Sequence, residues 1–358
     1  MSTPTGPLRQ RPQVPRGAVT AADGLLLLDK PQGMTSHDAV AMTRRLAATR
    51  KVGHAGTLDP MATGLLLLGV GRATRLLTHL VGADKSYTAT VRLGQETVTE
   101  DAEGEVTARH GCLPRAELAG RVDAALAALT GEIMQVPCAV SAVKVDGVRS
   151  YARVRGGEEV ALDARPVTVH ALARSGEPRP ATALDGTTVV DVDLRVSCSS
   201  GTYVRALARD LGRALGCGAH LTALRRTSVG PFDVDEAHTL EAASAQVEAG
   251  AAAEPPSGLV TMSPTEVARR CFPAVELDEA EARAIAYGQL LDEAVAARAV
   301  SPERAVVPKE RRPDGTARPR PVLAGFAPDG EVVALLSTGK GRTRPVLVLA
   351  PATGARTC

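Results

Sequence analysis

The residue best suited to chemistry is Asp59, which stands in a segment with three glycines and one histidine. The segment reads Lys51-Val-Gly-His-Ala-Gly-Thr-Leu-Asp-Pro-Met-Ala-Thr-Gly64. Glycines permit tight turns and a close approach of a ligand to the backbone. The hydrophobic residues 65–70 predict a buried strand that would anchor this loop. A carboxylate held there could act as a nucleophile, although an isolated Asp-Pro pair is more typical of a surface turn.

A second candidate segment places a tyrosine and arginines at the start of a predicted helix. It reads Cys198-Ser-Ser-Gly-Thr-Tyr-Val-Arg-Ala-Leu-Ala-Arg-Asp-Leu-Gly-Arg213. We expect a strand to end at Cys198 and a helix with a buried apolar stripe to begin near Thr202. The stripe consists of Val204, Leu207, Ala208, Leu211 and Leu215. Arg205, Arg209 and Arg213 recur every four residues, so we expect a basic ridge on another face, with a merely solvated face as the alternative.

Two further segments carry residues suited to binding a nucleobase or phosphates. Lys85-Ser-Tyr-Thr-Ala-Thr-Val-Arg-Leu-Gly94 alternates like a strand, in which a tyrosine such as Tyr87 is usually a packing residue. His220-Leu-Thr-Ala-Leu-Arg-Arg-Thr227 contains two arginines that suit phosphate contacts. Leu224 in the same segment is equally compatible with an ordinary core position.

These segments, which occur in order over about residues 24–234, resemble the signature of the TruB family of bacterial tRNA pseudouridine synthases. The resemblance implies that Asp59 is the catalytic nucleophile and that Tyr203 lies over the active site as a proton acceptor or positioning group. It also implies that Arg205 pairs with Asp59, and a nearby arginine would keep that carboxylate ionised. Attack on the ribose C1′ and attack on the base C6 both remain open.

The resemblance also implies a set of contacts with the RNA substrate. His54 would contact the RNA backbone or the flipped nucleotide, and the ring of Tyr87 would stack on the target base. Leu224 would pack beneath that base. The complete set of expected substrate-binding residues is His54, Lys85, Tyr87, Lys144, Tyr203, Leu224 and Arg225.

The segment that begins at Gln135 resembles the start of the family's RNA-gripping loop, which we expect at about residues 135–165. It departs from the family pattern at Cys138 and Val140, where many members have a proline and a tyrosine. The basic character of the loop persists, because Lys144 is followed by several arginines.

The expected strands and helices do not alternate strictly, which indicates an α+β fold with a mixed or antiparallel central sheet flanked by helices. Strands are expected at 24–29, 65–70, 87–93, 190–196, 322–326, 332–336 and 345–349, and helices at 35–50, 73–80, 114–129 and 279–287. The expected order is a disordered basic tail (1–23), the catalytic domain (24–240), an Ala-, Glu- and Pro-rich linker (241–263) and a small β-rich, PUA-like RNA-binding domain (264–358). With so few contacts across a linker, the catalytic domain should fold without the residues beyond about Gly258.

Composition argues against several other classes of protein. No run approaches about 18 apolar residues and no secretory signal is evident, so we expect a cytoplasmic protein without a membrane span. The six cysteines and seven histidines are scattered, so no metal site is expected. Residues 69–75 lack the third glycine of a dinucleotide fingerprint, so no cofactor is expected either. A net charge of +2 means that any RNA surface must come from local clusters of basic residues.

We therefore expect a cofactor-independent enzyme that converts uridine 55 in the T-loop of tRNA to pseudouridine, as a monomer without an obligate protein partner. One alternative is a non-catalytic RNA-binding or tRNA-folding protein, against which the joint presence of Asp59, Tyr87, Tyr203 and Arg205 argues. The other is a uridine isomerase acting on a different RNA. The bacterial type of the Asp59 segment and the separate C-terminal domain argue against that alternative.

Overall fold

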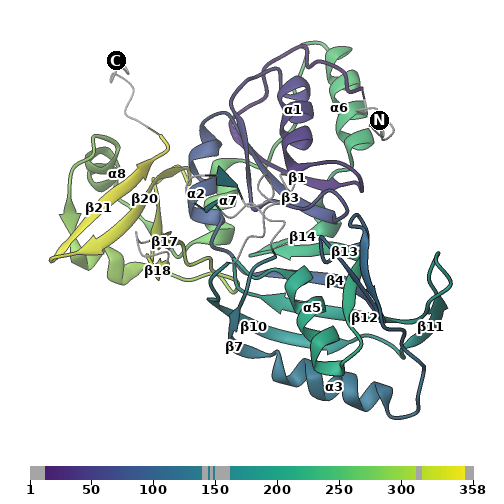
Figure 1. Cartoon of the computed structure of the whole chain (residues 1–358). Coiled ribbons are helices and arrows are strands. Elements are labelled where there is room, and N and C mark those ends of the chain that lie inside the picture. Colours follow the sequence, from purple (N-terminus) through teal and green to yellow (C-terminus); the bar gives the residue numbers. More distant parts are fainter. Residues whose placement is uncertain (1–12, 139–143, 146–147, 150–161, 312–316, 351–358) are drawn as a thin grey trace. The chain divides into compact units, whose positions relative to one another are not determined.

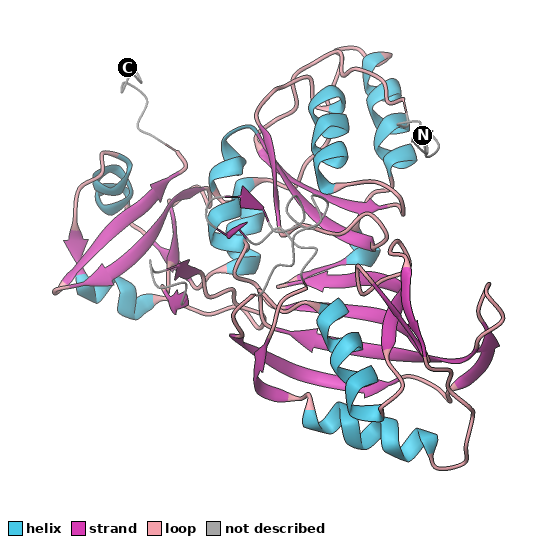
Figure 2. Ribbon diagram, viewed as in Figure 1, coloured by secondary structure: helices cyan, strands magenta, loops and turns pink. Residues whose placement is uncertain are grey.

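The computed structural model describes residues 13–138, 144–145, 148–149, 162–311 and 317–350 (Figure 1). The chain divides into two compact units. Unit 1 comprises Met1–Pro60, Gly64–Ala83 and Ser228–Cys358, and unit 2 comprises Met61–Thr63 and Asp84–Thr227. Strands and helices are mixed in both units (Figure 2), so the expected α+β class is confirmed. Most of the expected RNA-gripping loop and residues 1–12 of the expected tail lie outside the described residues.

The N-terminal part of unit 1 is built on two leucine-rich strands that pair antiparallel. They are β1 (Gly24–Lys30) and β3 (Thr63–Val70), in register at Leu27 and Leu67. Nearly every residue of both strands is buried, which is typical of strands covered on both faces. The surrounding elements are α1 (Ser36–Leu46), β2 (Val52–Ala55), η1 (Gly71–Arg75), α2 (Leu77–Leu80), β14 (Phe232–Asp233), η2 (Val234–Glu236) and α6 (Leu240–Ala251).

The C-terminal part of unit 1 is β-rich, as expected. Its five-stranded sheet has the order β15-β19-β20-β21-β16. The elements are α7 (Pro264–Cys271), β15 (Ala274–Glu276), α8 (Glu279–Ala286), β16 (Leu291–Asp292), η3 (Glu293–Arg298), β17 (Lys309–Arg311), β18 (Ala317–Pro319), β19 (Leu323–Phe326), β20 (Val332–Gly339) and β21 (Arg342–Val348).

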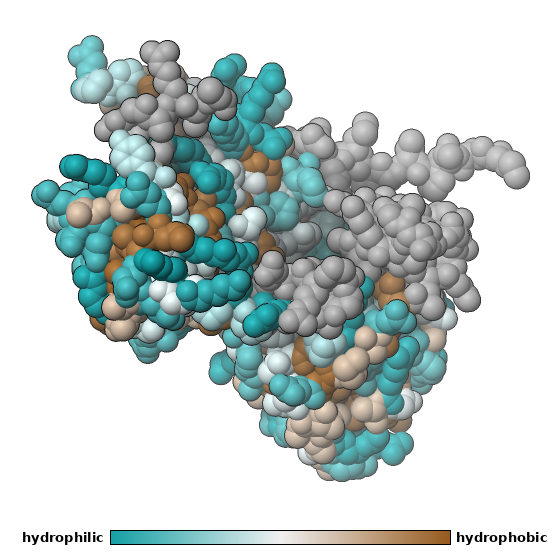
Figure 3. All heavy atoms as spheres, turned by 90° about the vertical axis from the view of Figure 1, so that its left-hand side faces the viewer, coloured by the Kyte–Doolittle hydropathy of each residue, from teal (hydrophilic) through white to brown (hydrophobic). Residues whose placement is uncertain are grey.

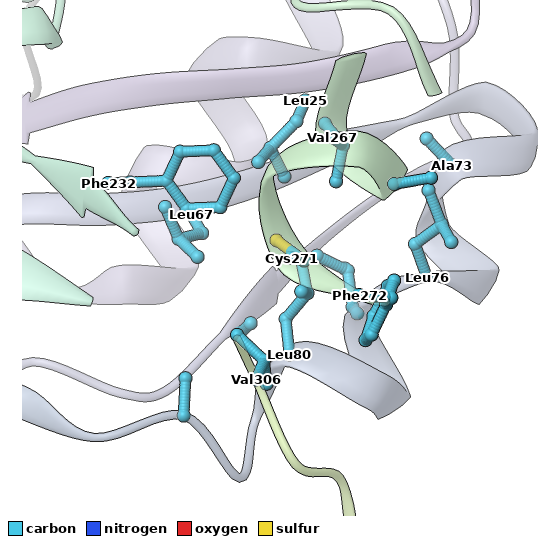
Figure 4. Packing of buried hydrophobic residues seen from close by; sticks show 14 of the residues in the cluster. Leu25, Leu67, Ala73, Leu76, Leu80, Phe232, Val267, Cys271, Phe272 and Val306 are labelled. Atoms are coloured by element: carbon cyan, nitrogen blue, oxygen red, sulfur yellow. The ribbon is translucent and has the colours of Figure 1, made fainter. Parts of the chain in front are cut away.

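The two parts of unit 1 share one hydrophobic core. Leu25, Leu67 and Leu76 belong to the same buried cluster as Val267 and Phe272 (Figure 4). Further members are Val322, directly before β19, and five residues of the C-terminal sheet: Ala324, Phe326, Val332, Leu335 and Leu347. Because β1, β3 and α2 pack against α7 and this sheet, the C-terminal part is not an independent module.

The segment 241–263 differs from the expected linker. Helix α6 covers its first half, begins at Leu240 after the N-cap residue Thr239, and packs against α1 and β1. Leu240, Ala243 and Val247 are buried on one face of that helix. Alanine and glutamate are strong helix formers, so the composition that suggested a linker also favours a helix. The linker prediction is therefore wrong for α6.

Unit 2 is a sheet covered by two helices. The strand order β4-β12-β10-β7 is antiparallel throughout, and β13 lies beside β4. The elements are β4 (Lys85–Leu93), β5 (Gln95–Thr97), β6 (Val106–Arg109), α3 (Leu118–Ala128), β7 (Gly131–Gln135), β8 (Lys144–Val145), β9 (Val148–Arg149), β10 (Arg165–Arg174), β11 (Arg179–Thr182), β12 (Thr188–Cys198), α5 (Val204–Leu215) and β13 (Ala219–Val229). Helices α3 and α5 pack against each other, and α3 packs on β10 (Figure 1).

The expected strands are confirmed, whereas several helix boundaries were wrong. Helix α1 ends at Leu46, not near residue 50, because Ala48 adopts a left-handed conformation (φ 48°). Helix α3 begins at Leu118, four residues later than expected. The expected helix at 73–80 is a 3₁₀ turn followed by a single α-helical turn.

Candidate active site

Asp59 lies in the loop of a β-hairpin in unit 1. Strands β2 and β3 pair antiparallel, with Ala55 opposite Leu67, and the chain reverses between them. Gly56 enters the loop with φ +83°, a conformation that other residues rarely adopt. Asp59 is half-buried, whereas its neighbour Leu58 is buried in the core. The loop therefore presents the carboxylate from a backbone that is anchored on both sides.

Two sets of hydrogen bonds hold the residues before and after Asp59. The buried Ser36 hydroxyl accepts a hydrogen bond from the Leu58 N–H at 2.9 Å and donates one to the Leu58 carbonyl at 3.1 Å. On the other side, the Gly33 N–H donates to the Pro60 carbonyl at 2.8 Å. The position of the Asp59 Cα is thus set by the turn that leads from β1 into α1.

A buried lysine supports the same turn and was missed by the sequence analysis. Lys30 is fully buried, and its ammonium donates to the carbonyls of Met34 at 2.8 Å, Pro31 at 3.0 Å and Pro60 at 3.5 Å. Backbone carbonyls stabilise a cation that has lost its water. The sequence did contain an indication of this burial, because Lys30-Pro31 stands at the end of an apolar strand.

The Ser36 clamp gives a testable prediction. Ser36→Ala leaves the N–H and carbonyl of Leu58 without that partner, so we expect a loss of stability of about 1–3 kcal/mol and a slower reaction at Asp59. The matched control is Thr43→Val, which removes a buried hydroxyl from the same helix whose hydrogen bond goes to the Ala39 carbonyl. Unfolding curves and single-turnover rates check both variants. A Ser36→Ala enzyme as fast as Thr43→Val would contradict the role of the clamp.

His54 lies on β2, five residues before Asp59, and faces a second histidine. The rings of His37 and His54 meet edge to face, with centroids 5.9 Å apart. His37 is exposed at the start of α1, and the sequence analysis did not identify it. The expected contact of His54 with RNA stays a prediction.

In unit 2, Tyr203 is the N-cap residue of α5, at the end of the turn that follows β12. Gly201 makes this turn with φ +96°. The backbone of Tyr203 is extended (φ −101°, ψ 109°), and the buried apolar stripe of α5 begins with the next residue, as expected. This places the Tyr203 and Arg205 side chains at the first turn of one helix.

Arg205 is buried and bound by a residue that the sequence analysis missed, Asp101. Its Nη1 lies 3.4 Å from Asp101 Oδ2 and donates to the Thr99 carbonyl at 2.8 Å. Asp101 is itself fixed, because its Oδ1 accepts from the Thr99 hydroxyl at 2.5 Å and from the Glu103 N–H at 3.0 Å. Asp101 thus orients Arg205, and the expected pairing of Arg205 with Asp59 stays a prediction.

The expected basic ridge on α5 does not form. Arg205 is buried. Arg209 forms two ion pairs, with Nη1 2.8 Å from Glu100 Oε1 and Nε 2.9 Å from Asp210 Oδ1. Burial opposes the charge of Arg209, but its partners Asp210 and Glu100 raise its pKa above the ordinary value. Only Arg213 of the three projects into solvent. The i, i+4 spacing was read correctly, but the helix face that it defines contacts acidic residues of the same unit.

Tyr87 and Arg226 form a buried pair in unit 2. Tyr87 is 8% exposed on β4, and Arg226 is 1% exposed on β13. Burial lowers the pKa of Arg226, and a hydrogen bond with the Tyr87 side chain acts in the opposite direction. The suggested phosphate contact of Arg226 is therefore wrong, because the guanidinium is inside the protein. It hydrogen-bonds the Tyr87 side chain there.

This pair predicts a stability effect of Tyr87→Phe. Removing the hydroxyl deprives a buried guanidinium of a partner, so we expect a loss of about 1–3 kcal/mol in the free energy of unfolding. Tyr287→Phe is the control, because Tyr287 is 58% exposed and its substitution should change stability by less than about 0.5 kcal/mol. Urea unfolding of both variants measures the difference. Equal stabilities would show that the pair contributes nothing.

The remaining expected site residues are distributed over unit 2. Lys85 is buried at the start of β4, Leu224 is buried in β13, and Arg225 is half-buried beside it. The backbone of Lys144 lies in the short hairpin β8–β9, and its side chain is outside the described residues. His54 and Asp59 belong to unit 1, so the expected residues come from both units.

Two features are absent from the described residues. Among them, no group of three or more His, Cys, Asp and Glu side chains is arranged to hold a metal ion. In the same part of the chain, no helix is long and apolar enough to cross a membrane.

Two solved structures contain chains that share the fold of this protein. The archaeal box H/ACA sRNP Nop10–Cbf5 complex contains a chain that matches with a TM-score of 0.62 at 24% identity, over 92% of this chain and 86% of that chain. A Cbf5-Nop10-Gar1 complex matches with a TM-score of 0.58 at 25% identity, over 91% and 83% of the two chains.

Sequence comparison then defines the family. Residues 44–204 match the TruB family pseudouridylate synthase N-terminal domain, and residues 205–262 match the tRNA pseudouridylate synthase B C-terminal domain. The tRNA pseudouridine synthase B of Arthrobacter sp. (strain FB24) is 53% identical over 92% of this chain and 97% of its own length. That of Streptomyces coelicolor is 46% identical over 92% and 98%. The chain therefore belongs to the TruB family of pseudouridylate synthases.

Proposed function

We propose that this protein converts uridine 55 in the T-loop of tRNA to pseudouridine, with Asp59 as the nucleophile. The chain belongs to this family, and the observation that carries the proposal is the way in which the loop holds Asp59. A half-exposed carboxylate stands between two residues whose backbone is clamped by Ser36 and Gly33. Holding a reacting group in one geometry is a large part of catalysis.

The reaction is an isomerisation, so no atom enters or leaves. Asp59 attacks the nucleotide at C1′ or C6, and the bond between N1 and C1′ breaks. The uracil turns and C5 bonds to C1′. The bond between Asp59 and the nucleotide breaks, which restores the free carboxylate, and a proton moves from C5 to N1. Tyr203, at the start of α5, accepts or positions this proton. In this proposal Arg205, which Asp101 orients, pairs with the Asp59 carboxylate.

The target uridine must leave its stack before it can react, and this costs a few kcal/mol. In the proposed complex the flipped base stacks on Tyr87, which Arg226 holds, and Leu224 packs beneath it. His54 contacts the RNA, and Lys85, Lys144 and Arg225 interact with the substrate by charge.

The C-terminal part of unit 1 offers further phosphate contacts. Its exposed basic residues include Arg318, Arg320, Lys340, Arg342 and Arg344. The face of the molecule drawn in Figure 3 is largely hydrophilic, with small apolar areas between polar side chains. We place the enzyme in the cytoplasm and propose that it acts as a monomer, without a protein partner or cofactor.

The test is to incubate the purified protein with an equimolar mixture of unmodified tRNA and ribosomal RNA transcripts and to map pseudouridine in each. We expect conversion at position 55 of the tRNA and at no other site. Binding of tRNA without conversion would support a non-catalytic RNA-binding or tRNA-folding protein. Conversion only in the other RNA would support an isomerase with a different substrate.

A further inference from the structure

Gln135 is the last residue of β7 and is 2% exposed. Its side-chain amide makes two hydrogen bonds with the backbone of one residue, Tyr203. Oε1 accepts from the Tyr203 N–H at 2.8 Å, and Nε2 donates to the Tyr203 carbonyl at 3.1 Å. This is the pattern by which two residues of an antiparallel sheet exchange hydrogen bonds, here made by a side chain. The amide thus fixes both the position and the orientation of the Tyr203 backbone.

The start of α5 also restrains the Tyr203 backbone. As the N-cap residue of α5 it is extended, and its N–H lies outside the helical hydrogen-bond ladder. Its carbonyl accepts from the Leu207 N–H at 3.2 Å, the first bond of the helix. The preceding turn contains Gly201, a residue with wide conformational freedom. The two hydrogen bonds with Gln135 therefore help to set the direction in which the Tyr203 side chain leaves the backbone.

Gln135 is itself held in place by the residues that follow it. The Val136 carbonyl accepts from Arg209 Nη2 at 2.9 Å. The Cys138 thiol donates to Glu100, whose carboxylate is paired with Arg209. Burial, and to a smaller extent the nearby charge of Glu100, raise the pKa of Cys138 well above its usual range, so this thiol keeps the proton it donates. The chain at and just after the end of β7 is thus joined to α5 directly at Gln135 and Val136, and through Glu100 at Cys138.

We propose that Gln135 is a positioning residue for Tyr203. The inference rests on the proposed function, in which Tyr203 acts at the reacting base. Methionine matches glutamine in length and shape but makes neither hydrogen bond. Gln135→Met should therefore let the Tyr203 backbone shift, and a displacement of about 1 Å can cost about 100-fold in rate. We expect the single-turnover rate to fall about 10- to 100-fold, with RNA affinity unchanged within about twofold.

Gln95→Met is the matched control. Gln95 is also a buried glutamine of unit 2, 3% exposed, but its amide donates to Asp185 instead of a residue of the proposed site. Both variants lose a buried amide, so both should lose stability. Only Gln135→Met should lose rate while affinity is kept. Equal rates for the two variants, or a loss for Gln135→Met that lies entirely in affinity, would overturn the inference.

Amide hydrogen exchange at Tyr203 provides a readout that needs no catalysis. In the wild-type protein the Tyr203 N–H should be protected, and in folded Gln135→Met it should exchange faster, whereas Gln95→Met should leave it unchanged. Rapid exchange of this N–H in the wild type would overturn the inference even if Gln135→Met fails to fold. If the wild type shows protection at Tyr203 but no isomerase activity, the proposed function fails, whereas the hydrogen bonds between Gln135 and Tyr203 are supported.

Discussion

Asp59→Asn is expected to abolish pseudouridine formation while RNA binding stays within about twofold of wild type. An amide has nearly the shape of a carboxylate but is a poor nucleophile. The fold should not change, because other residues anchor the loop on both sides of Asp59. Ser36 binds Leu58, and Gly33 binds Pro60. Single-turnover kinetics and a binding titration with the same tRNA separate the two effects.

The control for this variant is Asp23→Asn, also in unit 1. Asp23 is ion-paired with Arg72 at 2.7 Å on the surface, and neither residue belongs to the proposed site. Its substitution should leave the rate of pseudouridine formation at the wild-type level. Turnover by Asp59→Asn above a few per cent of wild type would disprove the assignment of Asp59 as nucleophile.

Removal of residues 259–358 is expected to prevent stable folding. The deleted residues include Val267 and Phe272, which pack in the same cluster as Leu25 and Leu67 (Figure 4). Phe326 belongs to this cluster as well. Exposing one fully buried leucine or phenylalanine costs about 1.5–3 kcal/mol. Uncovering several of them exceeds the whole stability of a typical domain, about 5–15 kcal/mol. This reverses the expectation, drawn from the supposed linker, that the N-terminal region folds alone.

The measurement is a thermal melt followed by circular dichroism, on the truncated and the full-length chain. Two full-length variants calibrate it. Phe272→Ala should destabilise by about 3–5 kcal/mol, whereas Val300→Ser, at a position 72% exposed, should have almost no effect. A cooperative melt of the truncated chain close to that of the full-length protein would contradict the shared core.

Local features of the sequence predicted the elements that carry the proposed chemistry. The apolar run before Val70 predicted β3, and the stripe that begins at Val204 predicted α5. Both follow from burial patterns along one element. The resemblance to a family then assigned a role to Asp59, which no single-element pattern could do.

The contacts that organise the site could not be read from the sequence, because they join residues far apart in the chain. Ser36 and Leu58 are 22 residues apart, and Gln135 and Tyr203 are 68 apart. The pairing of Arg205 with Asp101 is of the same kind. Such contacts depend on the packing of whole elements, which no local periodicity specifies.

Charge was also an incomplete guide to function. Arg209 and Arg226 have the residue type of phosphate-binding groups, yet they bind Glu100 and Tyr87 inside unit 2. An arginine can contact RNA only if its guanidinium is exposed, and exposure depends on which side of a strand or helix faces the core. The count of arginines in a motif therefore overestimates the RNA-binding surface.

The most direct test of the central claim uses a T-arm stem-loop whose only loop uridine is at position 55. The purified wild-type protein is incubated with this RNA, and with the same RNA carrying cytidine at that position, and pseudouridine is quantified by digestion and chromatography. We predict one pseudouridine per molecule of the first RNA and none in the second. Intact uridine at position 55 after incubation with excess, RNA-bound protein would contradict the account.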